Sequence, residues 1–242
     1  MRNIKIVIEY DGTAFHGWQY QPGLRTVQGE IRKALVKIFQ FEGNVVGAGR
    51  TDTGVHAKGQ VANFLINHSM PVLTIQAALN GNLCRDVRII SAEEVDENFH
   101  ARYNAIKRLY CYKITQRERA IDRFYMWCYK SQLDVKKIQQ ASNYLLGEHN
   151  FKAFCHAEEN VNHYRCYIEH IVWEQKDEIL TLNIIANRFL HNMVRIIIGT
   201  MINVGKGFTP IEQIPLILNS RDRRNAGPTV PAKGLCLEKV YY

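Results

Sequence analysis

The sequence predicts an α+β protein made of two consecutive β-α-β-β-α-β halves, with a mostly antiparallel sheet and helices on one of its faces. Three observations predict this fold. Short segments carry apolar residues at every second position, which is typical of strands. Other segments carry apolar residues three or four positions apart, which is typical of amphipathic helices. The two kinds of segment follow one another in the same order twice.

The first half begins with a strand at residues 3–10, where Ile4, Ile6 and Ile8 share one face. The Asp11-Gly12-Thr13 turn ends it. A helix is expected to follow Thr26, because apolar residues recur there with helical spacing. The remaining expected elements are strands at 45–46 and 60–66, a helix at 72–80 stopped by Asn80-Gly81, and a strand at 87–95.

The second half repeats this order without repeating the sequence. We expect, in turn, a strand at 109–115, a helix capped by Asp134 and ended by Gly147, strands at 165–175 and 179–186, a helix at 189–204, an additional helix from Thr209-Pro210, and a closing strand at 235–241. The predicted domains are residues 1–105 and 106–242. No Pro- or Gly-rich linker joins them, so we expect the halves to pack tightly and to form a central cleft with a site between them.

Composition and charge restrict the class of protein. The 242 residues are 46% hydrophobic and 22% charged, which is typical of globular domains, and the net charge of +8 favours polyanionic partners. The six cysteines form no Cys-x-x-Cys pair and no zinc-finger spacing, so we expect free thiols and no metal. The first residues contain charges, and no apolar stretch is long enough to span a membrane. These features predict a cytoplasmic protein.

The segment 47–57 has the most unusual composition in the chain. It holds three glycines, two threonines, Arg50, Asp52 and His56 between two predicted strands. Glycines allow a close approach of the backbone to a ligand, and polar loops on a strand scaffold often carry reactive groups. Arg50 and Asp52 lie two residues apart, so in an extended loop they point the same way. The alternative interpretation is a hairpin loop with a solvated ion pair.

The run Gly49-Arg50-Thr51-Asp52-Thr53-Gly54-Val55-His56-Ala57 resembles the signature of the tRNA pseudouridine synthase A family. Further segments along the chain are similar to the family's motifs: Glu9-Tyr10-Asp11-Gly12-Thr13, Phe15-His16-Gly17-Trp18-Gln19, Thr26-Val27-Gln28-Gly29-Glu30, Phe99-His100-Ala101-Arg102, Asn187-Arg188-Phe189-Leu190-His191-Asn192-Met193-Val194-Arg195 and Ala232-Lys233-Gly234-Leu235. The chain departs from the family at Thr53, Cys111 and Arg188, and none of these changes removes an acid, a base or an aromatic ring.

The resemblance implies a reaction and its partners. A uridine in the anticodon stem-loop of tRNA, among those numbered 38–40, would lose its N1–C1′ bond and be rejoined through C5, without a metal or other cofactor. The base must first leave its stack, at a cost of a few kcal/mol. Asp52 matches the family's catalytic aspartate, which attacks the sugar or removes a sugar proton. The resemblance also implies a homodimer.

Two further residues are candidates for the catalytic site. Arg195 matches the family's arginine that pairs with the carboxylate; apolar neighbours on both sides favour a paired arginine over an exposed one. Tyr110 matches the family's tyrosine, whose ring can stack on uracil. The alternative for Tyr110, and for Tyr112 two residues later, is packing within a strand.

The candidate RNA contacts are Arg25, Arg50, Lys107, Arg108, Tyr110 and His191. Arginines and lysines interleaved with tyrosines are typical of RNA-binding surfaces, although any single one can be merely solvated. His191, four residues before Arg195, is expected on the same helical face, and a structural histidine is the alternative. Three other functions remain open: a pseudouridine synthase for another RNA or another tRNA position, a non-catalytic protein that binds or folds RNA, and a metalloenzyme.

Overall fold

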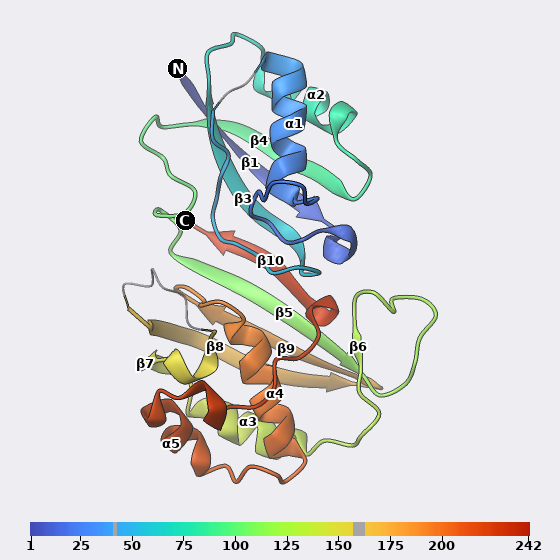
Figure 1. Cartoon of the computed structure of the whole chain (residues 1–242), viewed down its shortest axis with the longest axis vertical. Helices are drawn as coiled ribbons and strands as arrows, with labels where there is room; N and C mark the ends of the chain where they lie inside the picture. Colours follow the sequence, from blue (N-terminus) through green and yellow to red (C-terminus); the bar gives the residue numbers. More distant parts are fainter. Residues whose placement is uncertain (41–42, 157–162) are drawn as a thin grey trace. The chain divides into compact units, whose positions relative to one another are not determined.

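The chain folds into two compact units, which are described separately. A computed structural model describes residues 1–40, 43–156 and 163–242. Unit 1 consists of residues 1–106 and 236–242, and unit 2 of residues 107–235 (Figure 1). Within the described residues, no helix is both long and apolar enough to cross a membrane.

Unit 1 has the predicted β-α-β-β-α-β order. Its elements are β1 (Arg2–Tyr10), α1 (Val27–Phe39), β2 (Val46–Gly47), β3 (His56–Ile66), α2 (Val72–Asn82) and β4 (Val87–Val95). The strand order is β4-β1-β3, and both pairings are antiparallel. β2 pairs antiparallel with β3 through Val46 and Gly47.

The core of unit 1 lies between this sheet and its two helices. Ile4, Ile6 and Ile8 on β1 are fully buried, as their alternation predicted. The apolar stripe of α1 and the buried residues of α2 pack with them, and the two helices contact each other (Figure 1). Thr26 caps α1 by accepting a hydrogen bond from the Gly29 amide.

Unit 2 adds more elements to the predicted plan. Its elements are β5 (Lys107–Thr115), β6 (Trp127–Cys128), α3 (Val135–Asn143), β7 (Gly147–Asn150), β8 (Arg165–Lys176), β9 (Ile179–Ala186), α4 (Met193–Gly205) and α5 (Gln213–Ser220). The last strand, β10 (Leu235–Tyr241), starts at the end of unit 2 and belongs to unit 1 from Cys236 onward. The strand order is β5-β9-β8-β7, all antiparallel, and β6 pairs in parallel with β5. The short strands β6 and β7 were not predicted.

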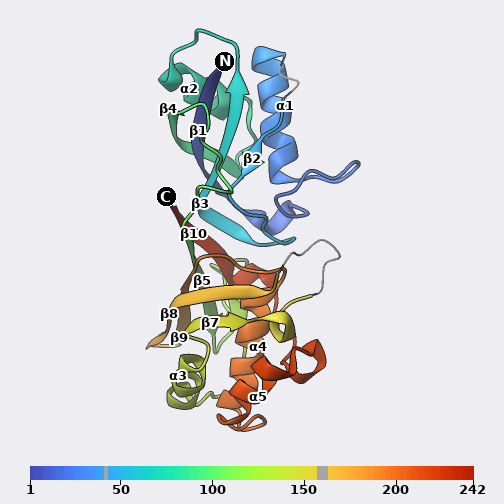
Figure 2. The same ribbon diagram turned by 90° about the vertical axis from the view of Figure 1, so that its left-hand side faces the viewer.

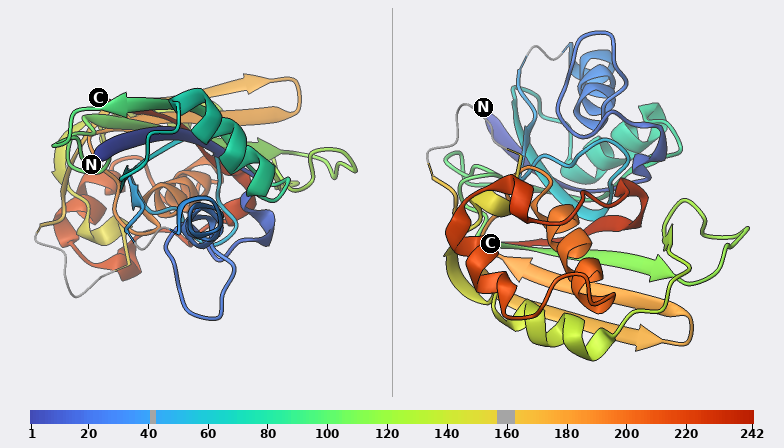
Figure 3. Two further views of the ribbon diagram at one scale, coloured as in Figure 1. Left: turned by 90° about the horizontal axis from the view of Figure 1, so that it is seen from above. Right: turned by 60° about the horizontal axis from the view of Figure 1, so that its bottom comes forward.

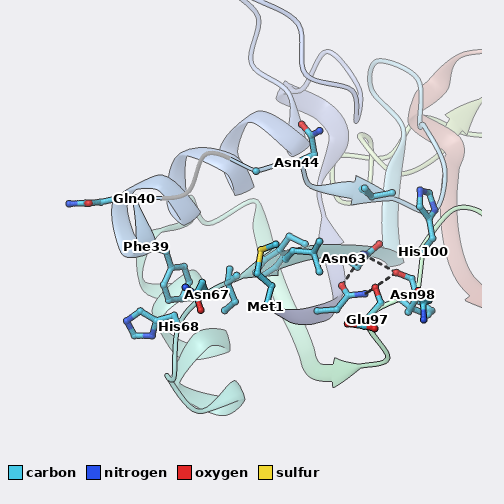
Figure 4. Close-up of a pocket in the computed structure, with 17 residues that line it drawn as sticks. Met1, Phe39, Gln40, Asn44, Asn63, Asn67, His68, Glu97, Asn98 and His100 are labelled. Carbon is cyan, nitrogen blue, oxygen red and sulfur yellow. Dashed lines mark hydrogen bonds between the residues drawn. The ribbon is translucent and has the colours of Figure 1, made fainter.

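The helices α3 and α4 contact each other in unit 2, and α3 also contacts β8 (Figures 2 and 3). Asp134 caps α3 as predicted, because its side chain accepts a hydrogen bond from the Lys137 amide. The buried Trp173 indole on β8 donates to Ser142 Oγ on α3 over 2.9 Å. This bond joins the helix to the sheet inside the core and satisfies a buried polar group.

The closing strand lies differently from our expectation. We predicted that residues 235–241 complete the second half, but from Cys236 onward they belong to unit 1. There, Cys236 and Leu237 pair in parallel with His56 and Ala57 of β3. Gly59 permits this approach, since a Cβ at that position would lie 2.4 Å from the Glu238 carbonyl oxygen. The assignment of two functional domains stays a prediction.

Several predicted helix boundaries were wrong. α2 continues through Asn80-Gly81 to Asn82, because one glycine near a helix end costs only about 1 kcal/mol. α3 ends at Asn143, and Gly147, with φ of +89°, begins β7. The fourth helix begins at Met193 and not at residue 189, since Asn192 has a left-handed φ of +60°. α5 begins at Gln213, after a turn at Pro210.

Two helical glycines should respond oppositely to substitution by alanine. Gly81→Ala in α2 meets open space and should stabilise the protein by roughly 0.4–1 kcal/mol. Gly199→Ala in α4 would place a Cβ 1.8 Å from the Pro228 carbonyl oxygen and should destabilise it by about 1–3 kcal/mol. Urea unfolding of both variants measures the difference. Equal shifts would show that the Pro228 segment does not lie against α4.

Candidate active site

The loop that connects β2 to β3 carries Asp52. The first two residues of the loop are held to β3, since the Ala48 amide donates to the Val61 carbonyl over 2.7 Å and Gln60 Nε2 donates to the Gly49 carbonyl over 3.0 Å. After Asp52 the chain turns sharply, with the Val55 amide donating to the Asp52 carbonyl over 3.1 Å. Gly54 supplies the required left-handed φ of +78°.

A second segment of unit 1, Phe15–Trp18, holds the middle of the loop. The Trp18 amide donates to the Thr51 carbonyl over 3.1 Å, and the Gly54 amide donates to the Phe15 carbonyl over 3.3 Å. Gly17 lies between them with φ of +81°, and a Cβ there would be 2.5 Å from the Thr51 carbonyl oxygen. Only glycine allows the two backbones to come so close, so this loop is fixed on both sides of Asp52.

The residue before Asp52 is anchored in the core. Thr51 Oγ1 lies 2.7 Å from the Tyr10 hydroxyl, in a hydrogen bond that is buried. Tyr10 is 3% exposed, and burial raises the pKa of its hydroxyl well above the ordinary value, so the phenol stays neutral. The Asp52 side chain is partly buried and the Arg50 side chain is exposed. The backbone is therefore rigid where the carboxylate begins.

His56 and Ala57 lie in the first part of β3, not in the loop as we expected. His56 Nδ1 is 3.0 Å from the Gly12 amide and 3.2 Å from Asp11 Oδ1. A neutral Nδ1 accepts from Gly12, whereas a protonated Nδ1 donates to Asp11. In either state, the buried imidazole ties the start of β3 to the turn after β1.

Arg25 has partners inside unit 1. Its guanidinium forms two hydrogen bonds with Asp86, of 2.7 and 2.9 Å, and lies 4.1 Å from the centre of the Phe15 ring. The hydrogen bonds to Asp86 raise the pKa of Arg25. The sequence analysis missed Asp86, because no motif or spacing connects it to Arg25, 61 positions earlier.

Tyr110 and Tyr112 occupy β5 in unit 2. Tyr110 is 8% exposed, and its ring meets the Phe189 ring edge-on, with centroids 5.2 Å apart. Tyr112 is fully buried and donates its hydroxyl to the Pro231 carbonyl over 2.8 Å. Burial raises the pKa of Tyr112 far above its ordinary value. Tyr112 is thus a packing residue, whereas Tyr110 keeps a small accessible area.

Arg195 lies in the first turn of α4 and is partly buried. Its Nε donates to the Val230 carbonyl over 2.8 Å, and its Nη1 donates to Asn192 Oδ1 over 2.6 Å. A cation at a helix N-terminus is disfavoured by the helix dipole, so this position favours a nearby anion. These bonds orient the guanidinium while leaving it charged.

We predicted His191 on the same helical face as Arg195, but this was wrong, because α4 begins only at Met193 and His191 precedes it. His191 is exposed, and its ring lies 5.9 Å from that of His156. Among the other candidates, Lys107 pairs with Glu169 over 2.9 Å, and Arg108 Nη1 donates to the Asn187 carbonyl over 2.6 Å. Both lie at the start of β5, on the same strand as Tyr110.

The candidate residues fall into two groups. Unit 1 holds Arg25, Arg50 and Asp52, and unit 2 holds Lys107, Arg108, Tyr110, His191 and Arg195. The first group offers a carboxylate on a rigid loop, able to act as a nucleophile or a base. The second offers an oriented cation and an aromatic ring. In the part of the chain that the structure describes, no cluster of three or more His, Cys, Asp or Glu could hold a metal ion.

Comparisons with known proteins cover the entire chain. A family model described as tRNA pseudouridine synthase matches residues 6–104 and 141–242. tRNA pseudouridine synthase A 2 of Clostridium perfringens is 45% identical over 244 residues, which cover all of both chains. tRNA pseudouridine synthase A of Brachyspira hyodysenteriae is 46% identical over 247 residues, covering 100% of this chain and 99% of that protein. The protein of that name from Acetivibrio thermocellus is 43% identical over the full length of both.

The Tyr10–Thr51 hydrogen bond should contribute measurably to stability. Tyr10→Phe leaves the buried Thr51 hydroxyl without this partner, so the free energy of unfolding should fall by about 1–3 kcal/mol. Denaturant unfolding measures this loss. Tyr20→Phe, at an exposed tyrosine, is the matched control and should change stability by less than about 0.5 kcal/mol. Equal values for the two variants would contradict the anchoring role.

Proposed function

Because this chain belongs to the tRNA pseudouridine synthase family, we propose that it modifies the anticodon stem-loop of tRNA, at the uridines numbered 38–40, with Asp52 as the catalytic carboxylate. It is an isomerase that converts uridine in tRNA to pseudouridine. The observation that carries the proposal for Asp52 is its position on a loop that hydrogen bonds fix at its start and in its middle.

The reaction requires a group that acts at the sugar. The N1–C1′ bond of uridine breaks, the uracil turns, and C5 bonds to C1′ and loses its proton. Asp52 either attacks C1′ or removes a proton from the sugar. Both roles need an ionised carboxylate held within bonding distance of the ribose, and a rigid loop lowers the entropic cost of reaching that geometry. The partial burial of Asp52 is consistent with limited solvation.

Arg195 is the proposed cationic partner of the carboxylate. A poorly solvated carboxylate stays ionised only when a cation or several hydrogen-bond donors stabilise it. Arg195 suits this role because its bonds to Val230 and Asn192 already fix its guanidinium. Its place in the first turn of α4 also makes an anionic partner electrostatically favourable.

Tyr110 is proposed to contact the uracil. Its edge-on packing against Phe189 fixes the plane of its ring, and its small exposed area allows contact with a flipped base. The ring can stack on uracil, and the hydroxyl can assist proton removal from C5. Tyr112 is not proposed for this role, since its hydroxyl already donates to the Pro231 carbonyl inside the core.

Contacts to the RNA backbone are proposed for Arg50, Lys107, Arg108, Arg25 and His191. Arg50 has the strongest support, because it is exposed and two residues from Asp52. Lys107 and Arg108 flank Tyr110 on β5. Arg25 would have to bind RNA while paired with Asp86, or exchange that partner for a phosphate. His191 is proposed because its side chain is exposed and it lies close to Arg195 in the sequence.

The family resemblance supports two further proposals, on the assembly and the location of the enzyme. We propose that it acts as a homodimer on tRNA, and that it works in the bacterial cytoplasm, where tRNA is modified. Sedimentation of the purified protein with and without tRNA would test whether it is a homodimer. Neither proposal requires a membrane segment.

The decisive experiment is to map pseudouridine in unmodified transcribed tRNA after incubation with the purified protein. We expect product in the anticodon stem-loop. Asp52→Asn and Asp52→Ala should abolish turnover and keep tRNA affinity within about tenfold, because they remove a transition-state group and no phosphate contact.

The control variant for this experiment is Glu93→Gln, which also removes a carboxylate in unit 1, one that is exposed and pairs with Lys5 outside the loop and the proposed RNA contacts. It should remain active. Loss of tRNA binding in parallel with loss of activity would count against Asp52 as the catalytic group. Pseudouridine at another tRNA position, or only in another RNA, would change the proposed substrate but leave the type of reaction unchanged.

Tyr110→Phe separates the role of the hydroxyl from that of the ring. The substitution keeps the packing against Phe189 and should lower kcat by roughly 10²–10⁴-fold if the hydroxyl assists proton removal. KM should stay near the wild-type value. Single-turnover kinetics with whole tRNA measure the effect. Full activity in this variant would leave Tyr110 only as a stacking platform.

A further inference from the structure

A cluster of three aromatic rings and a lysine lies in unit 2, outside the candidate catalytic residues; two of its rings are partly buried, and the third ring and the lysine are exposed. We name it the β6 patch and define it as Trp127, Tyr129, Lys206 and Phe208. The rings of Trp127 and Tyr129 are 4.9 Å apart. Lys206 Nζ lies 5.9 Å from the centre of the Tyr129 ring and 4.9 Å from that of Phe208. Phe208 is 70% exposed.

The fold builds this patch from two segments. β6 pairs in parallel with the end of β5, and the Tyr129 amide donates to the Thr115 carbonyl over 2.8 Å. Lys206 and Phe208 follow directly after α4, where Gly207 takes a φ of +76° and the Phe208 amide donates to the Asn203 carbonyl over 2.9 Å. Backbone hydrogen bonds therefore hold an exposed phenylalanine in place, although its burial contributes little to stability.

The chain next to the patch adds positive charge and further rings. The loop between β5 and β6 (Figure 1) presents Arg119 and Arg123, and the Arg123 guanidinium lies 4.3 Å from the centre of the exposed Phe124 ring. Arg117 and Lys130, by contrast, pair with Glu178 and Glu118. No ion pair with an acidic side chain occurs for Arg119, Arg123 or Lys206 in the residues that the structure describes. These cations remain available to a polyanion.

We propose that the β6 patch binds unpaired nucleotides of the tRNA other than the one that is modified. Exposed rings beside a cation suit nucleic acid, because bases stack on aromatic faces and phosphates are attracted to lysine and arginine. A protein partner would bury the rings but has no comparable need for the cations. This inference rests on the proposed function, which supplies tRNA as the polyanion.

The length of α4 separates the patch from the candidate catalytic residues. Arg195 and Lys206 are eleven positions apart along the chain, which corresponds to about 16 Å at 1.5 Å per helical residue. Stacked nucleotides in one strand lie about 3.4 Å apart. A uridine bound near Arg195 therefore cannot also occupy the patch. The patch increases affinity and determines which RNAs bind, but it takes no part in the isomerisation.

The test compares two double variants in steady-state kinetics with whole unmodified tRNA. The first, Lys206→Ala with Phe208→Ala, removes the exposed part of the patch. The second, Lys136→Ala with Leu216→Ala, removes an exposed lysine and an exposed apolar side chain elsewhere in unit 2. The patch variant should raise KM about tenfold or more, since loss of one stacked base costs roughly 1–3 kcal/mol. Its kcat should stay within about twofold of wild type, and the control should change neither constant.

Two further measurements decide between the outcomes. The thermal unfolding midpoints of both double variants should match that of the wild type, and this result would exclude misfolding. If the midpoint of the patch variant is lower, Phe208→Ala alone is tested in its place. Filter binding of labelled tRNA should show the same loss of affinity. A patch variant with wild-type KM and affinity would overturn the inference, and so would one that changes only the oligomeric state. If the wild type binds tRNA but forms no pseudouridine, the proposed function fails while the binding assay still tests the patch.

Discussion

The arrangement of the candidate site depends on how the loop before β3 is held. A short polar loop rich in glycine and threonine would sample many conformations in isolation. Here the buried Tyr10–Thr51 hydrogen bond anchors it to β1, and the Phe15–Trp18 segment binds it through two backbone hydrogen bonds. These bonds thus offset the entropic cost of ordering the loop during folding, so that this cost does not reduce the free energy of substrate binding. A catalytic carboxylate benefits directly, because its approach to the ribose needs no further ordering of the backbone.

The same principle explains the roles of the arginines. Arg25 is fixed by two hydrogen bonds to Asp86 and by the Phe15 ring, beside the segment that holds the loop. Arg195 is fixed by two neutral acceptors at the start of α4. Asp86 thus fixes Arg25 within unit 1, whereas the place of Arg195 in the first turn of α4 makes an anion near its guanidinium electrostatically favourable. That position supports Arg195 as the group that stabilises a catalytic carboxylate.

The aromatic residues of unit 2 differ in their exposure. Tyr110 and Tyr112 lie on one strand, and the fully buried Tyr112 donates its hydroxyl to the Pro231 carbonyl, whereas Tyr110 keeps a small accessible area. Tyr129 and Phe208 lie beside Lys206, and the exposed Phe208 ring leaves apolar area in contact with water. Such area is retained when a ligand covers it. The candidate catalytic residues and the β6 patch thus serve different parts of one RNA substrate.

The sequence by itself determined the order of the longer strands and helices, the cap of α3, and the loop that carries Asp52. These features depend on local periodicity and on side chains that bond to their own backbone, so they can be read from neighbouring residues. Only the tertiary structure decided that residues after Cys236 pair with β3, that Asp86 binds Arg25, and that His191 precedes α4. The first two join residues far apart in the chain, and the third depends on a left-handed φ at Asn192 that no periodicity indicates.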